Sequence, residues 1–183
     1  MRIVGGRPHG IQPCVNHPRP APSPPNPSPP VSHLDLVRYA GTWHEIARLP
    51  MYFQRKCTGP VTATYTLQAD GTVAVHNECV TADGGTISSD GVARRLEPFS
   101  QGKLEVRFAP KWLSWLPMVW ADYWVIALDD DYRWAMVGQP GRKYLWILSR
   151  TPRMDEAAFS SLRERAVAMG YDLAPLLISG DLD

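Results

Sequence analysis

Two of the three cysteines in this chain are spaced so that they could form a covalent cross-link. The segment between Cys57 and Cys79 contains a hairpin signal at Asp70-Gly71. In such a hairpin Cys79 pairs near Thr62, five residues after Cys57, and a fold-back of the chain can bring the two sulfurs together. We therefore expect a Cys57–Cys79 disulfide, which indicates an oxidising compartment.

The competing interpretation is that one of these cysteines is a free, reactive thiol. A nucleophilic thiol needs a neighbouring base or cation that lowers its pKa. The sequence shows no such group, because His44 is expected on the outer face of its strand and His76 has no evident partner.

No pattern for metal or phosphate chemistry is recognisable. The five histidines lack ligand spacing, and the sequence has no Gly-rich phosphate loop, nucleophile elbow or HExxH motif. We expect no metal site, no cofactor and no enzymatic activity. The histidines are His9, His17, His33, His44 and His76.

Short alternating segments separated by turn signals predict the elements that position these residues. The alternation of apolar and polar residues, with a turn about every ten residues, is typical of antiparallel strands joined by hairpins. Sequential strands joined in this way pair as neighbours, so we expect up-and-down order. The eight expected strands are 42–48, 61–68, 72–81, 86–96, 103–108, 123–128, 133–137 and 143–149.

One helix is predicted after the last of these strands. Asp155 can cap its start, and Gly170 follows as a stop signal. Phe159 and Leu162 begin an apolar stripe at helical spacing that must pack on the outside of the sheet. A short final strand is expected near 176–179.

The first 33 residues differ in composition from the remainder. They hold ten of the 18 prolines and no acidic residue, and residues 34–183 hold 16 basic and 18 acidic residues. We expect 1–33 to be a disordered tail or a polyproline spacer, and 34–183 to be one domain. A lipid anchor on Cys14 is an alternative to a free tail, although no apolar signal run precedes it. Nucleic-acid binding is not expected from a slightly acidic domain, and no stretch is apolar enough to span a membrane.

Three motifs resemble those of the lipocalin family. Gly41-Thr42-Trp43 matches its GxW motif, and Arg150 matches the arginine that follows the last barrel strand. The middle motif of the family, usually Thr-Asp-Tyr, is present here only as Leu128-Asp129, and the tyrosine stands later, at Tyr132. Four sequence segments are similar to those of the bacterial outer-membrane lipocalins allied to apolipoprotein D. They are GTWHEIARLP, VTATYTL, VIALD and YLWILSRTP. The resemblance covers roughly residues 34–179.

The resemblance implies an all-β fold: an eight-stranded up-and-down antiparallel barrel, a calyx, with the helix packed outside. It also implies structural roles for Gly41, Trp43, Asp129 and Arg150. Trp43 would close one end of the barrel, with the Arg150 guanidinium over its ring in a cation–π contact.

Strand parity then indicates which side chains face the calyx. If Trp43 points inward, Glu45 and Ala47 do so as well, and Arg48 points outward. A carboxylate inside the calyx is tolerated if it is paired or protonated. Glu45 therefore either forms an ion pair near Arg150 or contacts a ligand headgroup.

Further ligand-binding residues are expected in the barrel and around its mouth. Two long loops flank the mouth, and their apolar residues could form a lid, touch a membrane surface or form a homodimer contact. The expected lining residues are Val61, Tyr65 and Trp146 in the barrel, and Met51, Tyr52, Phe53, Trp112 and Trp115 in the loops.

The function implied by the resemblance is carriage or storage of a small hydrophobic ligand. A fatty acid or lysophospholipid suits such a calyx, and the bacterial periplasm or outer membrane is the implied location. The alternative is a lipid-acting enzyme that uses Cys57 or Cys79 as a reactive thiol, as the prostaglandin D synthase of animals does.

Overall fold

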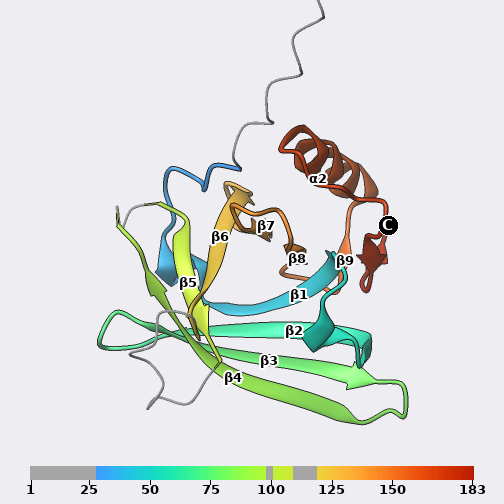
Figure 1. The fold of residues 1–183 in the computed structure, drawn as a ribbon, viewed down its shortest axis with the longest axis horizontal. Helices are drawn as coiled ribbons and strands as arrows, with labels where there is room; N and C mark the ends of the chain where they lie inside the picture. The colour runs from blue at the N-terminus through green and yellow to red at the C-terminus, as the bar shows by residue number, and fades with distance from the viewer. Residues whose placement is uncertain (1–27, 98–100, 109–118) are drawn as a thin grey trace, which may run out of the picture.

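The computed structural model describes residues 28–97, 101–108 and 119–183. Eight antiparallel strands follow one another in sequence order, and the first also pairs with the eighth, which closes the sheet into a barrel (Figure 1). This confirms the predicted eight-stranded up-and-down barrel. The strands are β1 (Gly41–Arg48), β2 (Cys57–Leu67), β3 (Val73–Thr81), β4 (Thr86–Arg95), β5 (Lys103–Arg107), β6 (Ala121–Leu128), β7 (Trp134–Gly138) and β8 (Leu145–Ser149).

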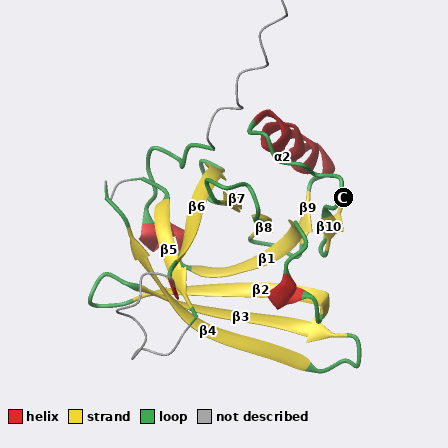
Figure 2. Cartoon of the chain, viewed as in Figure 1, coloured by secondary structure: helices red, strands yellow, loops and turns green. Residues whose placement is uncertain are grey.

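Smaller elements flank the barrel (Figure 2). The predicted final strand is present as β10, and it extends the sheet by pairing with β1. Among the described residues, no helix is long and apolar enough to cross a membrane. These elements are α1 (Leu36–Tyr39), the 3-10 helix η1 (Tyr52–Gln54), β9 (Arg153–Met154), α2 (Glu156–Ala168), β10 (Leu177–Ile178) and β11 (Asp181–Leu182), which pairs in parallel with β9.

The predicted helix is α2, and local signals set both of its ends. The Asp155 carboxylate accepts a hydrogen bond from the Ala158 amide at 2.8 Å. Gly170 follows the helix with a φ of +87°, a conformation that glycine adopts without steric cost. Figure 1 shows α2 outside the barrel, on the side away from β2, β3 and β4.

Two β-bulges shape the outer face beneath α2. The register of β1 against β8 shifts between Glu45 and Ala47, and that of β6 against β7 shifts between Val125 and Ala127. A bulge breaks the strict alternation of side chains. Consecutive pairs, Ile46-Ala47 and Ile126-Ala127, therefore both join the apolar cluster under α2.

The bulge in β1 corrects the expected parity. Ala47, expected in the calyx, is fully buried in the cluster beneath α2. Arg48, expected outside, turns back to the Glu45 carboxylate. The alternation in β8 holds: Leu145 and Ile147 face α2, while the Trp146 and Leu148 side chains belong to the interior cluster.

The closed end of the barrel is organised around Trp43, which is fully buried. Its indole Nε1 donates to the Tyr39 carbonyl oxygen at 2.8 Å, and the Arg150 Cζ lies 3.9 Å from the centre of its ring. The same guanidinium donates to the carbonyl oxygens of Arg38, Tyr39 and Thr42. Trp43 and Arg150 thus tie α1, β1 and the end of β8 together.

Gly41 is the motif residue with a backbone reason for its identity. Its φ is +98°, in the region that favours glycine. A Cβ at this position would stand 3.3 Å from Nη1 of Arg150. The GxW glycine therefore makes room for the arginine that covers the tryptophan.

The folded part of the chain begins before the expected boundary at residue 34. Ser28 is fully buried, and the Val31 amide donates to the Val125 carbonyl oxygen at 2.8 Å. The Gly102 amide donates in turn to the Val31 carbonyl oxygen. Residues 28–33 thus lie against the barrel, and residues 1–27, which include Cys14, lie outside the described residues.

Trp43→Ala should lower the free energy of unfolding by roughly 3–5 kcal/mol, because it empties a large fully buried site and removes the surface on which Arg150 rests. Its effect on ligand selectivity should be much smaller, since Trp43 does not line the cavity described below. Urea unfolding and ligand titration check this. Unchanged stability would contradict a structural role.

Arg150→Ala should lower the free energy of unfolding by roughly 2 kcal/mol, through loss of the cation–π contact and of the bonds to α1. Arg163→Ala is the matched control, because that guanidinium lies 5.9 Å from the Phe159 ring on the exposed side of α2. The control should change stability by less than about 0.5 kcal/mol. Equal losses in urea unfolding would mean that the position of Arg150 is not special.

Candidate functional site

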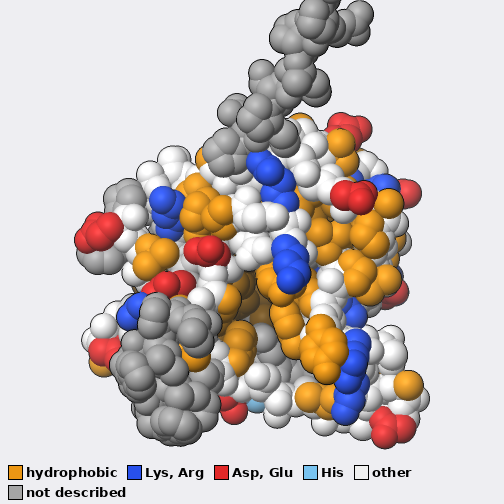
Figure 3. Space-filling view, viewed as in Figure 1, with side chains coloured by type: hydrophobic (Ala, Val, Ile, Leu, Met, Phe, Trp, Pro, Cys, Tyr) orange, Lys and Arg blue, Asp and Glu red, His pale blue; other side chains and the backbone are white. Residues whose placement is uncertain are grey.

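The barrel encloses a cavity of about 480 Å³ that opens at the end opposite Trp43. Its wall is mainly apolar, with a few polar groups, as is usual for small-molecule sites. Figure 3 shows hydrophobic side chains gathered across the middle of one face of the molecule, with Lys and Arg side chains among them. The lining includes Glu45, Phe53, Gln54, Cys57, Val61, Ala63, Tyr65, Val75, Cys79, Ile87, Val106, Phe108, Tyr123, Tyr144, Trp146 and Leu148.

Half of the expected ligand-binding residues line this cavity. They are Glu45, Phe53, Val61, Tyr65 and Trp146. The alternation of β2 explains why Val61 and Tyr65 could be placed from sequence, because that part of the strand carries no bulge.

Three of the other expected lining residues lie elsewhere. Met51 is buried but does not border the cavity, and Tyr52 is 76% exposed on the outer side of η1. Ala47 lies under α2 for the reason given above. Trp112 and Trp115 lie outside the described residues.

Glu45 is held by a buried polar network near the mouth. Its carboxylate accepts hydrogen bonds from Arg48 Nη1, from Ser179 Oγ at 2.8 Å and from Gln54 Nε2 at 3.0 Å. Gln54 Oε1 accepts in turn from the indole Nε1 of Trp146 at 3.2 Å. The prediction that Glu45 forms an ion pair near Arg150 is wrong, because Arg150 lies over Trp43 at the closed end. Glu45 forms its ion pair with Arg48 instead.

This network leaves Glu45 little capacity for a ligand. Both carboxylate oxygens already accept hydrogen bonds, and the charge is compensated by a buried guanidinium. Arg48 also donates to the Cys57 carbonyl oxygen at 3.1 Å. The network therefore fixes the loop between β1 and β2 against the barrel wall.

Three tyrosine hydroxyls bond to one another at the inner end of the cavity, which Tyr65 and Tyr123 border. The hydroxyl of Tyr123 lies 2.9 Å from that of Tyr39 and 2.8 Å from that of Tyr65. Burial raises the pKa of Tyr65 to about 12, and burial also raises the pKa values of Tyr39 and Tyr123 well above the usual range. The three hydroxyls are therefore neutral donors and acceptors at physiological pH.

Cys57 and Cys79 form the expected disulfide, with an S–S distance of 2.02 Å. The register differs by one residue from expectation, since Val61 is opposite Cys79 and a bulge separates Val61 from Cys57. Both cysteines border the cavity, and the bond ties the start of β2, where the β1–β2 loop ends, to β3. It also removes the free thiol that the enzymatic alternative requires.

His76 lies on the outer surface of β3, with a partner that sequence analysis missed. Its Nδ1 is 2.7 Å from the Asp90 carboxylate on β4, because the two residues are cross-strand neighbours. The hydrogen bond to Asp90 raises the pKa of His76 above its ordinary value. Across the described ranges, no group of three or more His, Cys, Asp or Glu side chains could hold a metal ion.

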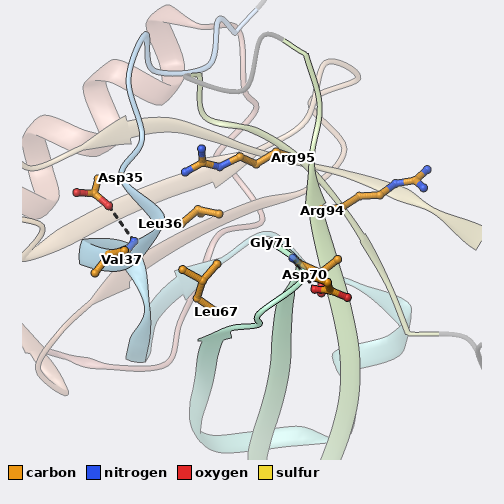
Figure 4. A pocket seen from close by; sticks show the side chains of 9 residues that line it. Asp35, Leu36, Val37, Leu67, Asp70, Gly71, Arg94 and Arg95 are labelled. Atoms are coloured by element: carbon orange, nitrogen blue, oxygen red, sulfur yellow. Dashed lines mark hydrogen bonds between the residues drawn. The ribbon is translucent and has the colours of Figure 1, made fainter.

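A second depression lies outside the closed end, between α1, the β2–β3 turn and the end of β4 (Figure 4). Asp35 accepts the Val37 amide at 2.8 Å and so caps α1. Arg94 pairs with Glu105, and Arg95 donates to the Leu34 carbonyl oxygen. These side chains serve the local structure, and the interior cavity is the better candidate site.

Sequence reasoning missed Tyr39, Tyr123 and Gln54 as site residues. Tyr39 comes from a helix of four residues, which is too short to leave a periodic signal. Tyr123 and Val125 point inward by strand alternation, but the β6 bulge interrupts this alternation directly after Val125. Two residues are too few to predict the direction of Tyr123 from sequence. Gln54 reaches the cavity from η1 and has no sequence signal.

Comparison with known proteins is consistent with this architecture. The model of the family described as "Lipocalin-like domain" matches residues 34–180. Temperature-induced lipocalin-1 of Arabidopsis thaliana is 45% identical over 148 residues, which are 80% of this chain and 78% of that protein. Outer membrane lipoprotein Blc of Escherichia coli K12 is 37% identical over 158 residues, or 86% and 85% of the two chains. Mouse apolipoprotein D is 30% identical over 156 residues, or 80% and 77%.

Solved structures share the fold at lower identity. Insecticyanin of the tobacco hornworm Manduca sexta superposes with a TM-score of 0.62 at 22% identity, covering 85% of this chain and 84% of its own. The cockroach allergen Per a 4 superposes with a TM-score of 0.60 at 19% identity, covering 84% and 91%. At these identities the likeness concerns the fold alone.

Replacing both disulfide cysteines by serine should lower the free energy of unfolding by roughly 3 kcal/mol, because the bond closes a loop across a separation of 22 residues. Urea unfolding of the oxidised protein and of Cys57→Ser/Cys79→Ser measures the difference. Thiol titration in denaturant should find two fewer thiols than cysteines before reduction. A full count of thiols would contradict the bond.

The free energy of unfolding should fall steeply between about pH 10 and pH 12. Unfolded tyrosines ionise near their ordinary pKa of about 10, whereas folding holds the Tyr65 proton to about pH 12. The stability contributed by the neutral phenol is thus fully present below pH 10 and is lost as the pH rises towards 12. Urea unfolding across this range should give a shallower fall for Tyr65→Phe, and identical slopes would contradict the assignment.

Proposed function

This chain belongs to the lipocalin family, whose general function is to bind a small hydrophobic molecule in the calyx, and from that premise we propose that it carries or stores a fatty acid or a lysophospholipid. The observation that supports this ligand class best is the mainly apolar cavity of about 480 Å³ inside the barrel. Burial of an acyl chain contributes about 0.8 kcal/mol per methylene group.

Charge around the mouth favours an anionic or zwitterionic headgroup at the outer end. Arg55 and Lys56 are exposed on the loop that follows η1, and Lys143 is exposed beside Tyr144 on the opposite loop. Phe53 and Tyr144 border the cavity and pack edge to face, with ring centres 5.7 Å apart. An acyl chain would pass this aromatic pair while its headgroup stayed near the cations.

Binding rather than catalysis is proposed because neither cysteine that borders the cavity is a free thiol. Cys57 and Cys79 are joined to each other, and the buried carboxylate of Glu45 already accepts hydrogen bonds from Arg48 and Gln54. The tyrosine hydroxyls are poor acids at neutral pH because burial raises the pKa of each.

The cell envelope is the location that we propose. A disulfide at the mouth suits an oxidising compartment, and one relative is named an outer membrane lipoprotein. Tyr52 and Phe53, which are 76% and 63% exposed beside Arg55 and Lys56, suit transient contact with an anionic lipid surface during ligand exchange.

A fluorescent fatty acid should quench the tryptophans saturably, with micromolar or tighter affinity. Ala63→Phe should weaken binding at least tenfold, because the new ring fills a cavity-lining position on β2. Thr66→Phe is the matched control on the same strand, at an exposed position that does not line the cavity.

The control should bind as the unaltered protein does, and both variants should unfold cooperatively in urea. Absence of saturable quenching in the unaltered protein would contradict the proposal. Equal weakening by both variants would place the ligand outside the barrel. Mass spectrometry of an organic extract from protein purified without detergent identifies the natural ligand.

A further inference from the structure

The tyrosine cluster at the inner end of the cavity has a geometry fixed by ring packing. The rings of Tyr39 and Tyr65 have centres 5.5 Å apart, and those of Tyr65 and Tyr123 have centres 6.0 Å apart. Tyr39 packs in turn on Trp43, with ring centres 5.0 Å apart. Tyr65 and Tyr123 border the cavity, whereas Tyr39 lies behind them.

The three tyrosine hydroxyls have one more hydrogen-bond donor than the bonds between them use. Three hydroxyls carry three hydrogens, and the two bonds that Tyr123 makes with Tyr39 and Tyr65 use two of them. Within the described parts of the chain, these hydroxyls make no other hydrogen bond. One O–H donor thus has no partner among the described residues and is available to a molecule in the cavity.

The unused hydrogen can lie on any of the three oxygens. It lies on Tyr123 when both neighbours donate to that hydroxyl, on Tyr65 when the bonds run from Tyr39 towards Tyr65, and on Tyr39 when they run the other way. In two of these three arrangements the donor belongs to a residue that borders the cavity. An acceptor inside the cavity would favour those two arrangements.

The chemistry of the cluster favours a neutral acceptor over a carboxylate. A carboxylate needs several donors or a cation to replace its hydration, and the cluster offers one donor. Burial opposes negative charge on the phenols more strongly than the charge of Arg150 favours it at Tyr39. A ketone, ester or hydroxyl oxygen needs only the one bond.

We infer that Tyr65 and Tyr123, with Tyr39 packed behind them, form a hydrogen-bonding floor that selects ligands with a neutral oxygen at the end that enters first. This inference rests on the proposed function and names its ligand class more closely: an acyl chain that carries a hydroxyl or oxo group far from its headgroup. The headgroup stays at the mouth, and the inner oxygen accepts the unused tyrosine hydrogen.

The test uses octadecanoic acid and its positional oxo derivatives, each displacing a fluorescent fatty acid from the whole chain. One oxo position should bind roughly 3- to 10-fold more tightly than the unmodified acid, because one hydrogen bond is gained there. Tyr65→Phe/Tyr123→Phe, which removes both hydroxyls that border the cavity, should abolish that preference. Tyr39→Phe is the matched control and should retain it, because the remaining pair makes one bond and leaves one donor at the cavity.

The outcomes separate this inference from the proposed function. If no acid displaces the probe, the proposed function fails. If all acids bind equally to the unaltered protein, or if the double variant keeps the preference, the function stands and the tyrosine floor is wrong. Loss of the preference in Tyr39→Phe as well would also overturn the inference, because any change of ring packing would then have the same effect. Urea unfolding confirms that each variant is folded.

Discussion

The contact between the Arg150 guanidinium and the Trp43 ring is the interaction on which the closed end depends. Closing a sheet into a barrel joins its two outermost long strands, and this contact lies beside their junction. The guanidinium also donates to three carbonyl oxygens in α1 and β1. It therefore fixes Trp43, the side chain that closes this end of the barrel, and with it the position at which the cavity ends.

Both bulges shape the outer face of the barrel, which packs against α2. A strictly alternating β1 or β6 would present every second residue to α2, and the bulges add Ala47 and Ala127 to that face. These small side chains allow close packing of α2, while Phe159 and Leu162 fill the space between strands. The same local irregularity turns Arg48 towards Glu45, so helix packing and the polar network at the mouth have one structural origin.

The elements that could be predicted from sequence are those in which a regular period persists. Alternation in β2 and β8 gave the direction of Val61, Tyr65 and Trp146, and the cap at Asp155 gave the start of α2. The bulge in β1 has no sequence signal, so Ala47 and Arg48 were assigned to the wrong faces. Tyr39 and Gln54 reach the site from single turns of helix, and a single turn has no period to detect. The pairing of Glu45 with Arg48 depends on that same bulge and could not be inferred from alternation.

The closure of the barrel also constrains how the chain can fold. The residues that the Arg150 guanidinium joins lie up to 112 positions apart, and Ser179 near the C-terminus bonds to Glu45 in the first strand. Contacts between residues so distant in sequence slow folding, because the loop between them must close before any stabilisation is gained. During synthesis, β1 keeps an open strand edge until β8 has left the ribosome. The nascent barrel therefore exposes its apolar interior for most of its translation, which makes protection from aggregation a requirement of this topology.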